Sequence, residues 1–177
     1  MKGKLKAIFL VFIPIFLSAV LLFAFDKFLD EQIELNYNDA LGKTYGVDEM
    51  NKGVKLLSHN AKKDDLIILG SSELANADYI AQNPANIFPN NHLASSPSLV
   101  GRAYVQDLLN GIKIGALGDG FKDKKIILIV SLQWFLEKEI NKDGFKAHFS
   151  ELQFYKTMNN EKISENEKKY ICTRVLD

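Results

Sequence analysis

A Gly-Ser-Ser turn follows a short apolar run, and it offers two hydroxyl groups that could do chemistry. The run spans Leu66 to Leu69, and the turn is Gly70-Ser71-Ser72. Such a run suits a strand buried on both faces of a parallel sheet, and parallel α/β sheets bind ligands beyond the carboxyl ends of their strands. Glycine permits a sharp turn there, and free N–H groups at the start of a following helix can stabilise an oxyanion. The pattern therefore makes a serine of this turn a candidate nucleophile.

The same turn also has a purely structural interpretation. Serine is among the most favoured N-cap residues, so a strand, a Gly-Ser-Ser turn and a helix need no further function. Leu74 stands where the Gly-x-Ser-x-Gly elbow of α/β-hydrolases has its second glycine. A nucleophilic serine also needs a base, usually a histidine, but none of the three histidines belongs to an Asp-x-x-His pair: His59, His92 and His148. The residues alone leave both interpretations open.

Composition and motifs exclude several other kinds of site. The chain has 22 basic and 22 acidic side chains, so it lacks the basic excess typical of nucleic-acid binding. Cys172 is the only cysteine and the histidines are far apart, so the sequence predicts neither an intrachain disulfide nor a metal site. The glycines between Gly115 and Gly120 are not followed by Lys-Ser/Thr and therefore do not form a P-loop. We expect no cofactor.

The N-terminal segment is long and apolar enough to cross a membrane. No charge occurs between Ala7 and Phe25, and nineteen helical residues span about 28 Å, close to the hydrocarbon thickness of a bilayer. Three lysines precede this segment, whereas Asp26, Lys27 and later acidic residues follow it. The positive-inside bias places the N-terminus in the cytoplasm and the rest of the chain outside. A cleaved signal peptide is the competing interpretation, but the apolar region is longer than a usual signal core.

The remaining sequence alternates helix-like and strand-like segments. We expect a basic tip and anchor over 1–25, a polar stalk over 26–46, and a domain over 47–177. Its predicted elements are helices over 47–60, 100–117, 145–158 and 164–176, buried strands over 66–69 and 125–132, and a loop over 82–98. This order predicts a three-layer α/β domain with a parallel sheet. Two convincing strands are few for such a sheet, so we expect the domain to be incomplete, with an exposed strand edge and poor solubility of residues 26–177.

Several local patterns together resemble the DltD family, whose membrane-anchored members take part in the D-alanylation of teichoic acids in Gram-positive bacteria. The matching pieces occur in the family's order behind one apolar segment: ILGSSEL (68–74), NPANIF (83–88), LVGRAYVQDLLN (99–110), IGALGD (114–119), KKIILIVSLQWF (124–135) and HFSELQFYKTMNNEKIS (148–164). They cover essentially this whole chain but only the first part of a family member's usual length. Leu132 departs from the family's usual Ser-Pro-Gln-Trp-Phe, and Asn83 replaces the histidine of its His-Pro-x-Asn motif.

The resemblance implies a fold and a site. It implies a variant of the SGNH-hydrolase fold, a flavodoxin-like α/β sandwich, in which Ser72 is the nucleophile and Ser71 is the fallback. The N–H groups of Ser72 and Gly101 would then face the oxyanion. Gln133 and Trp134 would line the same sheet edge, although an aromatic hook that packs against the sheet explains them equally well. The family's catalytic Asp and His lie near its C-terminus, at positions beyond Asp177.

Three functions follow from this sequence. The first is a serine acyltransferase or thioesterase that is anchored in the membrane and acts outside the cell. Its Ser72 would take D-alanine from an ester or thioester donor and pass it to a hydroxyl of the teichoic-acid polymer. The second is a non-catalytic member that only docks other membrane proteins of the pathway. The third, a carrier or thioesterase helper facing the cytosol, needs the opposite topology, and the lysine bias argues against it.

Overall fold

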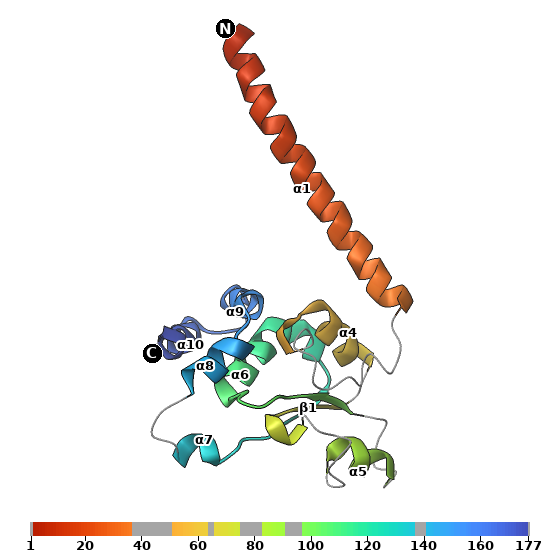
Figure 1. The fold of residues 1–177 in the computed structure, drawn as a ribbon, viewed down its shortest axis with the longest axis vertical. Coiled ribbons are helices and arrows are strands. Elements are labelled where there is room, and N and C mark those ends of the chain that lie inside the picture. The colour runs from red at the N-terminus through yellow and green to blue at the C-terminus, as the bar shows by residue number, and fades with distance from the viewer. Residues whose placement is uncertain are drawn as a thin grey trace. The chain divides into compact units, whose positions relative to one another are not determined.

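The computed structural model describes residues 2–36, 51–63, 66–74, 83–90, 97–136 and 141–176. The chain divides into two compact units, Met1–Asn38 and Asp39–Asp177. The first contains one long helix, α1 (Lys2–Asn36), drawn in red in Figure 1. Within its part from Leu10 onward, an 18-residue window has a mean hydropathy of 2.1 and no buried residue, so by length and composition this helix could cross a membrane. The rest of the predicted stalk, residues 37–46, lies outside the described residues.

The second unit contains a parallel sheet of three strands in the order β2-β1-β3. The strands are β1 (Leu66–Leu69), β2 (Ser98–Val100) and β3 (Lys125–Leu128). Leu69 is paired with Val100 on one side and with Leu128 on the other. All three strands therefore end at the same edge of the sheet, and the segments that follow them meet there. The expectation of helices combined with a parallel sheet is confirmed.

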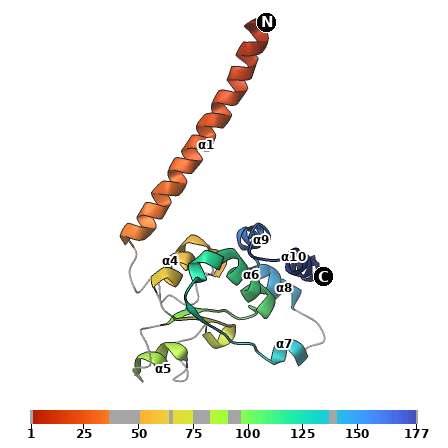
Figure 2. The same cartoon turned by 180° about the vertical axis from the view of Figure 1, so that it is seen from behind.

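Helices lie on both faces of the sheet (Figures 1 and 2). The side chains of β1 alternate between two apolar clusters, one on each face. Ile67 and Leu69 pack with residues of α4 (Lys55–Lys63) and α6 (Asp107–Leu117). Leu66 and Ile68 pack on the other face with Leu74, Leu99 and Phe88 of α5 (Pro84–Asn90). All four β1 residues are buried, as the apolar run predicts. The sheet thus has one core on each face.

Three helices form the C-terminal part of the described chain, and α9 packs on α6. They are α8 (Lys142–His148), α9 (Glu151–Met158) and α10 (Glu165–Leu176). Thr157 Oγ1 of α9 donates a hydrogen bond to Ile112 O at 2.7 Å, and a Cβ on Gly115 would lie 2.6 Å from Thr157 Cγ2. The predicted capping box is confirmed, because Ser164 N donates to Glu167 Oε2 at 2.9 Å and Glu167 N donates to Ser164 Oγ at 3.3 Å.

Several predicted boundaries were wrong for local reasons. The expected helix over 100–117 begins only at Asp107, because residues 98–100 form β2, which is too short to show a period in the sequence. The expected loop over 82–98 contains α5, which Asn83-Pro84 opens with Pro84 at the first helical position. The single helix expected over 145–158 is two helices, since Ser150 caps a new start by accepting a hydrogen bond from Gln153 N.

The predicted N-terminal helix of the domain is also displaced. Residues 47–50 lie outside the described residues, residues 51 and 52 are helical, and α4 begins only at Lys55, after Gly53. Glycine weakens a helix interior, so a break at Gly53 follows from its backbone freedom. Three backbone carbonyls around this break accept hydrogen bonds from α9 and its cap: Gln153 Nε2 binds Asn51 O and Gly53 O, and Ser150 Oγ binds Lys52 O.

The third strand differs most from expectation. The sequence predicted a strand buried on both faces over 125–132, but β3 ends at Leu128 and all four of its residues are exposed. Exposed apolar side chains occur from β3 into the following residues: Ile126, Ile127, Leu128, Val130, Leu132, Phe135 and Leu136. Strand β3 pairs with β1, at one end of the three-strand order. Residues 126–136 therefore contain many apolar and strand-forming residues that the described part of the chain leaves exposed.

Candidate functional site

The Gly-Ser-Ser turn joins β1 to a short 3-10 helix, η1 (Ser72–Leu74). Gly70 N extends the sheet by donating to Val100 O at 3.0 Å, and Leu74 N donates to Ser71 O at 3.2 Å. Glu73 bends back over the turn, so that its Oε1 accepts a hydrogen bond from Ser71 N at 2.6 Å. The turn is thus held by three hydrogen bonds, one to the neighbouring strand β2 and two within the turn itself.

The two serines of the turn face different environments. Ser71 is buried, with 2% of its surface exposed, and its Oγ donates a hydrogen bond to Arg102 O at 3.1 Å. Ser72 is exposed, and within the described part of the chain it makes no side-chain hydrogen bond. Ser71 is therefore fixed by the fold, whereas the hydroxyl of Ser72 remains available to a ligand.

The backbone N–H groups of Ser72 and Gly101, both at this sheet edge, have no acceptor among the described residues. Gly101 directly follows β2 and lies against the turn, because a Cβ there would be 2.7 Å from Ser71 O and 2.9 Å from Gly70 C. Only glycine allows the two backbones to approach so closely. Gly101 does not begin a helix as expected, but it lies next to the serine turn.

The loop after Gly101 has a strained backbone. Val105 N donates to Arg102 O at 3.1 Å, and within this turn Tyr104 has a φ of 66°. A side chain other than glycine pays a conformational cost in this region of φ, and such residues are often found at functional sites. Gly144 of α8 packs on Tyr104, since a Cβ there would meet the Tyr104 side chain at 2.8 Å. Helix α8 therefore lies beside the loop that follows β2.

Gln133 and Trp134 follow the third strand, as expected. They begin the short helix α7 (Gln133–Leu136), in which Trp134 N donates to Ser131 O at 3.2 Å. Ile129 N donates to Leu69 O at 2.8 Å, so the chain is still alongside β1 four residues before Gln133. Gln133 is exposed and Trp134 is half-buried. Their roles as pocket residues remain a prediction.

Two acidic residues near the turn were not singled out from the sequence. Glu73 follows Ser72, and Asp107 is the first residue of α6. Burial, and to a lesser extent the neighbouring Glu73, raises the pKa of Asp107. Asn110 Nδ2, also of α6, donates to Gly70 O at 3.3 Å. Sequence reasoning missed Asp107 because it placed the start of this helix seven residues too early.

Of the described histidines, neither His59 nor His148 forms a hydrogen bond with Ser72. His59 follows Ser58, and Ser58 lies against Gly120, which precedes β3, so this region belongs to the end of the sheet where β3 starts. His148 ends α8, and His92 lies outside the described residues. Within the described residues there is also no group of three His, Cys, Asp or Glu side chains that could hold a metal.

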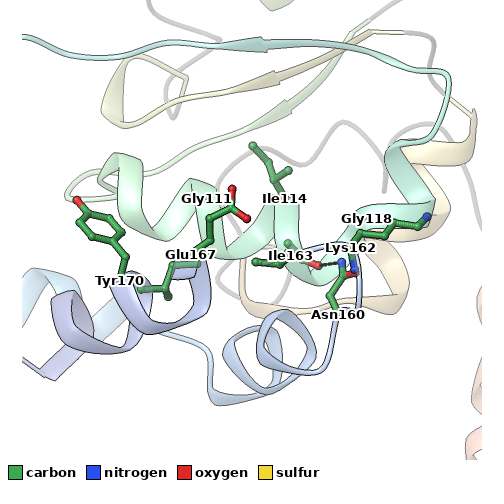
Figure 3. A pocket seen from close by; sticks show the side chains of 10 residues that line it. Gly111, Ile114, Gly118, Asn160, Lys162, Ile163, Glu167 and Tyr170 are labelled. Carbon is green, nitrogen blue, oxygen red and sulfur yellow. Dashed lines mark hydrogen bonds between the residues drawn. The ribbon is translucent and has the colours of Figure 1, made fainter. Parts of the chain in front are cut away.

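A cavity of about 380 Å³ lies elsewhere, between α6 and α10 (Figure 3). Its walls come from both helices and the turn before α10: Gly111, Ile114, Gly115, Gly118, Asn160, Lys162, Ile163, Glu167, Tyr170 and Ile171. Asn160 Nδ2 crosses it to bind Gly115 O at 2.8 Å, and Glu167 is occupied by the capping box. None of the predicted site residues lines this cavity.

Comparison with known proteins agrees with the pattern of motifs. The family model described as "DltD protein" matches residues 45–177, three quarters of the chain. The chain belongs to the DltD family. Protein DltD of Bacillus subtilis (strain 168) is 36% identical over 111 residues, which cover 63% of this chain and 28% of that protein. Protein DltD of Staphylococcus aureus (strain NCTC 8325 / PS 47) is 33% identical over 110 residues, 62% of this chain and 27% of that protein. The matched part of the chain thus spans little more than a quarter of the length of these DltD relatives.

Proposed function

We propose that this DltD-family chain carries the nucleophilic serine of an acyl transfer that adds D-alanine to teichoic acids. The observation that carries the proposal is the exposed Ser72 hydroxyl at the carboxyl end of β1, beside the N–H groups of Ser72 and Gly101, which have no acceptor among the described residues. Such donors stabilise the oxyanion of an acyl-transfer intermediate. An SGNH-like arrangement of the sheet is part of this proposal.

The chemistry has two steps on one oxygen. Ser72 Oγ attacks the acyl carbon of a D-alanyl ester or thioester, its proton passes to a base, and the donor's oxygen or sulfur leaves with the bonding electrons and gains a proton. A hydroxyl of the polymer then attacks the D-alanyl serine ester and restores the Ser72 hydroxyl. The family resemblance assigns the base and its orienting carboxylate to a segment outside these 177 residues. The reaction requires no cofactor.

We also propose that α1 anchors the chain in the membrane with its N-terminus in the cytoplasm. Lys2, Lys4 and Lys6 precede the apolar segment, which supports this direction. Lys27 lies over the Phe23 ring at 5.6 Å, an arrangement that suits the end of a membrane segment. Two single-cysteine variants, Lys4→Cys and Glu31→Cys, each in a Cys172→Ser background, test this orientation. A membrane-impermeant maleimide should label intact cells only at position 31, and labelling only at position 4 would reverse the topology.

The alternative function is non-catalytic docking to other membrane proteins of the pathway. The exposed apolar side chains from Ile126 to Leu136 favour it, because unpaired strands and apolar patches are common binding surfaces. In this case Ser72 would have no chemical role. The two functions thus predict different effects of Ser72→Ala on D-alanylation.

A chimera separates the two functions. Residues 45–177 of this chain would replace the corresponding segment of the Bacillus subtilis relative, and ester-linked D-alanine on teichoic acid would be measured in cells that lack their own copy. Acyl transfer predicts that the chimera restores D-alanine and that Ser72→Ala abolishes it, whereas Ser71→Ala changes chiefly the amount of folded protein. Docking predicts that Ser72→Ala restores D-alanine as fully as the parent chimera does.

A further inference from the structure

Tyr104 has a backbone conformation that its residue type does not favour. Its φ is 66°, and it is the third residue of a turn that Val105 N closes by donating a hydrogen bond to Arg102 O at 3.1 Å. A positive φ at this place in a turn is characteristic of type II turns, which favour glycine or asparagine there. For a bulky residue such a φ is an outlier that costs free energy. Local conformational preference therefore does not account for a tyrosine here.

A second turn of the same kind contains a residue that suits it. Lys124 N donates to Phe121 O at 3.2 Å, and Asp123, the third residue of that turn, has a φ of 61°. Aspartate tolerates this region because its short polar side chain can hydrogen-bond locally. Asp123 lies just before β3, at the end of the sheet where the strands begin. The two turns share a backbone conformation, but only the turn of Tyr104 lies beside the serine turn.

Burial does not account for Tyr104 either. The residue is 47% exposed, and its hydroxyl forms no hydrogen bond within the described part of the chain. The side chain is nevertheless held in place, because a Cβ on Gly144 of α8 would lie 2.8 Å from both Cβ and Cγ of Tyr104. A tyrosine with a positioned ring and an available hydroxyl is suited to contact with a ligand.

Tyr104 is tied to the serine turn through one carbonyl group. Arg102 O accepts hydrogen bonds from Ser71 Oγ and from Val105 N, both at 3.1 Å, so it closes the turn of Tyr104 and also binds the serine turn. Gly101, whose N–H is a proposed oxyanion donor, is three residues before Tyr104. Residues in unfavourable backbone conformations cluster at active sites and ligand clamps. These contacts place Tyr104 at the rim of the proposed acyl site.

We propose that Tyr104 binds the acceptor polymer, with its hydroxyl hydrogen-bonded to an oxygen of the polymer next to the hydroxyl that receives D-alanine. This inference rests on the proposed acyl-transfer function, and it gives Tyr104 a binding role and no part in activating Ser72. A polymer extends beyond the acyl group on the serine, so it must pass over the rim of the site. Hydroxyl and phosphate oxygens both accept a hydrogen bond from a phenol.

Two substitutions of Tyr104 and one matched control test the inference in the chimera that carries residues 45–177. Tyr104→Phe removes only the hydroxyl, whereas Tyr104→Asn removes the whole ring and suits a positive φ. Asp123→Asn places the same residue in the equivalent turn at the other end of the sheet. Urea denaturation of the full chain in micelles should show no loss of stability in Tyr104→Asn, because the relieved backbone strain offsets the lost ring contact.

Two rates separate binding of the acceptor from reactivity of the serine. Permeabilised cells with the chimera give the initial rate of radiolabelled D-alanine incorporation into teichoic acid per amount of folded protein, and a fluorophosphonate gives the rate of Ser72 modification. Tyr104→Phe and Tyr104→Asn should each lower incorporation about fivefold, the loss expected for one hydrogen bond to the substrate. Both should keep the parent's rate of Ser72 modification, and Asp123→Asn should change neither rate.

The remaining outcomes distinguish failure of this inference from failure of the proposed function. Incorporation at the parent's rate in Tyr104→Phe overturns the role of the hydroxyl and leaves acyl transfer by Ser72 in place. A parallel fall in Ser72 modification also overturns the binding role, because it would show that Tyr104 acts on the serine turn. A parent chimera that neither incorporates D-alanine nor reacts at Ser72 contradicts the proposed function, and the inference fails with it.

Discussion

Ser71 Oγ donates a hydrogen bond to the carbonyl oxygen of Arg102 at 3.1 Å, which ties the end of β1 to the loop after β2. This bond directs the first serine of the motif into the protein, and the adjacent Ser72 faces solvent. The two adjacent serines therefore face opposite environments and have different roles. Ser71 holds two segments of the sheet edge together, and Ser72 presents its hydroxyl.

The two serines should differ in their contribution to stability. Ser71→Ala removes a partly buried hydrogen bond and leaves the Arg102 carbonyl without that donor, so we expect a loss of about 1–2 kcal/mol in the free energy of unfolding. Ser72→Ala removes an exposed hydroxyl and should change it by less than about 0.5 kcal/mol. Urea denaturation of the full chain in micelles measures both, and an equal loss in the two variants would contradict the assignment.

Gly101 should tolerate no side chain. A Cβ there would lie 2.7 Å from Ser71 O, so Gly101→Ala must displace the serine turn, at a cost of about 1–3 kcal/mol. Gly111→Ala is a matched control, because a Cβ at Gly111 meets nothing within 4 Å and alanine favours a helix by roughly 0.5–1 kcal/mol. Urea denaturation should therefore show opposite signs for the two variants. If Gly101→Ala left the free energy of unfolding unchanged, the two backbones could not approach as closely as the 2.7 Å distance to Ser71 O requires.

Because of Lys113, the free energy of unfolding of the domain should increase as the pH rises through the alkaline range. It is 1% exposed, its Nζ binds Asn51 Oδ1 at 3.1 Å, and burial lowers its pKa to about 8 from 10.5. Below pH 8 the amine is charged in both states, so the folded state bears the full cost of burying the charge. Between pH 8 and 10.5 the folded state releases the proton first, so the free energy of unfolding should rise with pH, by roughly 3 kcal/mol in total.

Lys113→Met isolates this effect. Both proteins contain the same other titrating groups, so the difference between their free energies of unfolding at about pH 7 and about pH 10 reports on Lys113. The parent chain should gain stability relative to the variant as the pH rises. A difference that stays constant across this range would show that the amine keeps its ordinary pKa.

The exposed apolar residues after β3 should cause self-association. Leu132, Phe135 and Leu136 are 76%, 68% and 82% exposed, and apolar patches next to a strand edge promote aggregation. Residues 39–177 without the anchor should therefore elute as oligomers, and Leu132→Gln with Leu136→Gln should increase the monomer fraction. Size-exclusion chromatography with light scattering measures this, and a Glu161→Gln control should leave the distribution unchanged. A monomeric parent segment would contradict the expectation.

The sequence predicted the parts of the fold in which local pattern and burial agree. The apolar run of β1 and the Ser164-Glu167 capping box are both present as expected. Strand β2 was missed because its three residues, Ser98 to Val100, are too few to show a period, and its pairing with β1 is a long-range contact. The exposure of β3 was missed for a related reason, since its composition predicts burial but burial depends on what covers it.

The candidate site was predictable only in outline. The Gly-Ser-Ser motif and the strand before it indicated a reactive serine, but which serine faces solvent depends on the Ser71–Arg102 hydrogen bond, and these residues are 31 positions apart. The proximity of Gly101 to the turn follows from strand pairing and is not visible in its neighbours in the sequence. Asp107 was missed because helix periodicity sets a helix start only to within several residues.

The most direct test of the central claim is the position at which a serine-reactive fluorophosphonate modifies the chimera that carries residues 45–177. Digestion and mass spectrometry of the labelled protein would locate the adduct. We expect modification of Ser72, its loss in Ser72→Ala and its persistence in Ser71→Ala. An adduct on Ser71, or labelling that is unchanged in Ser72→Ala, would contradict the assignment of Ser72 as the nucleophile.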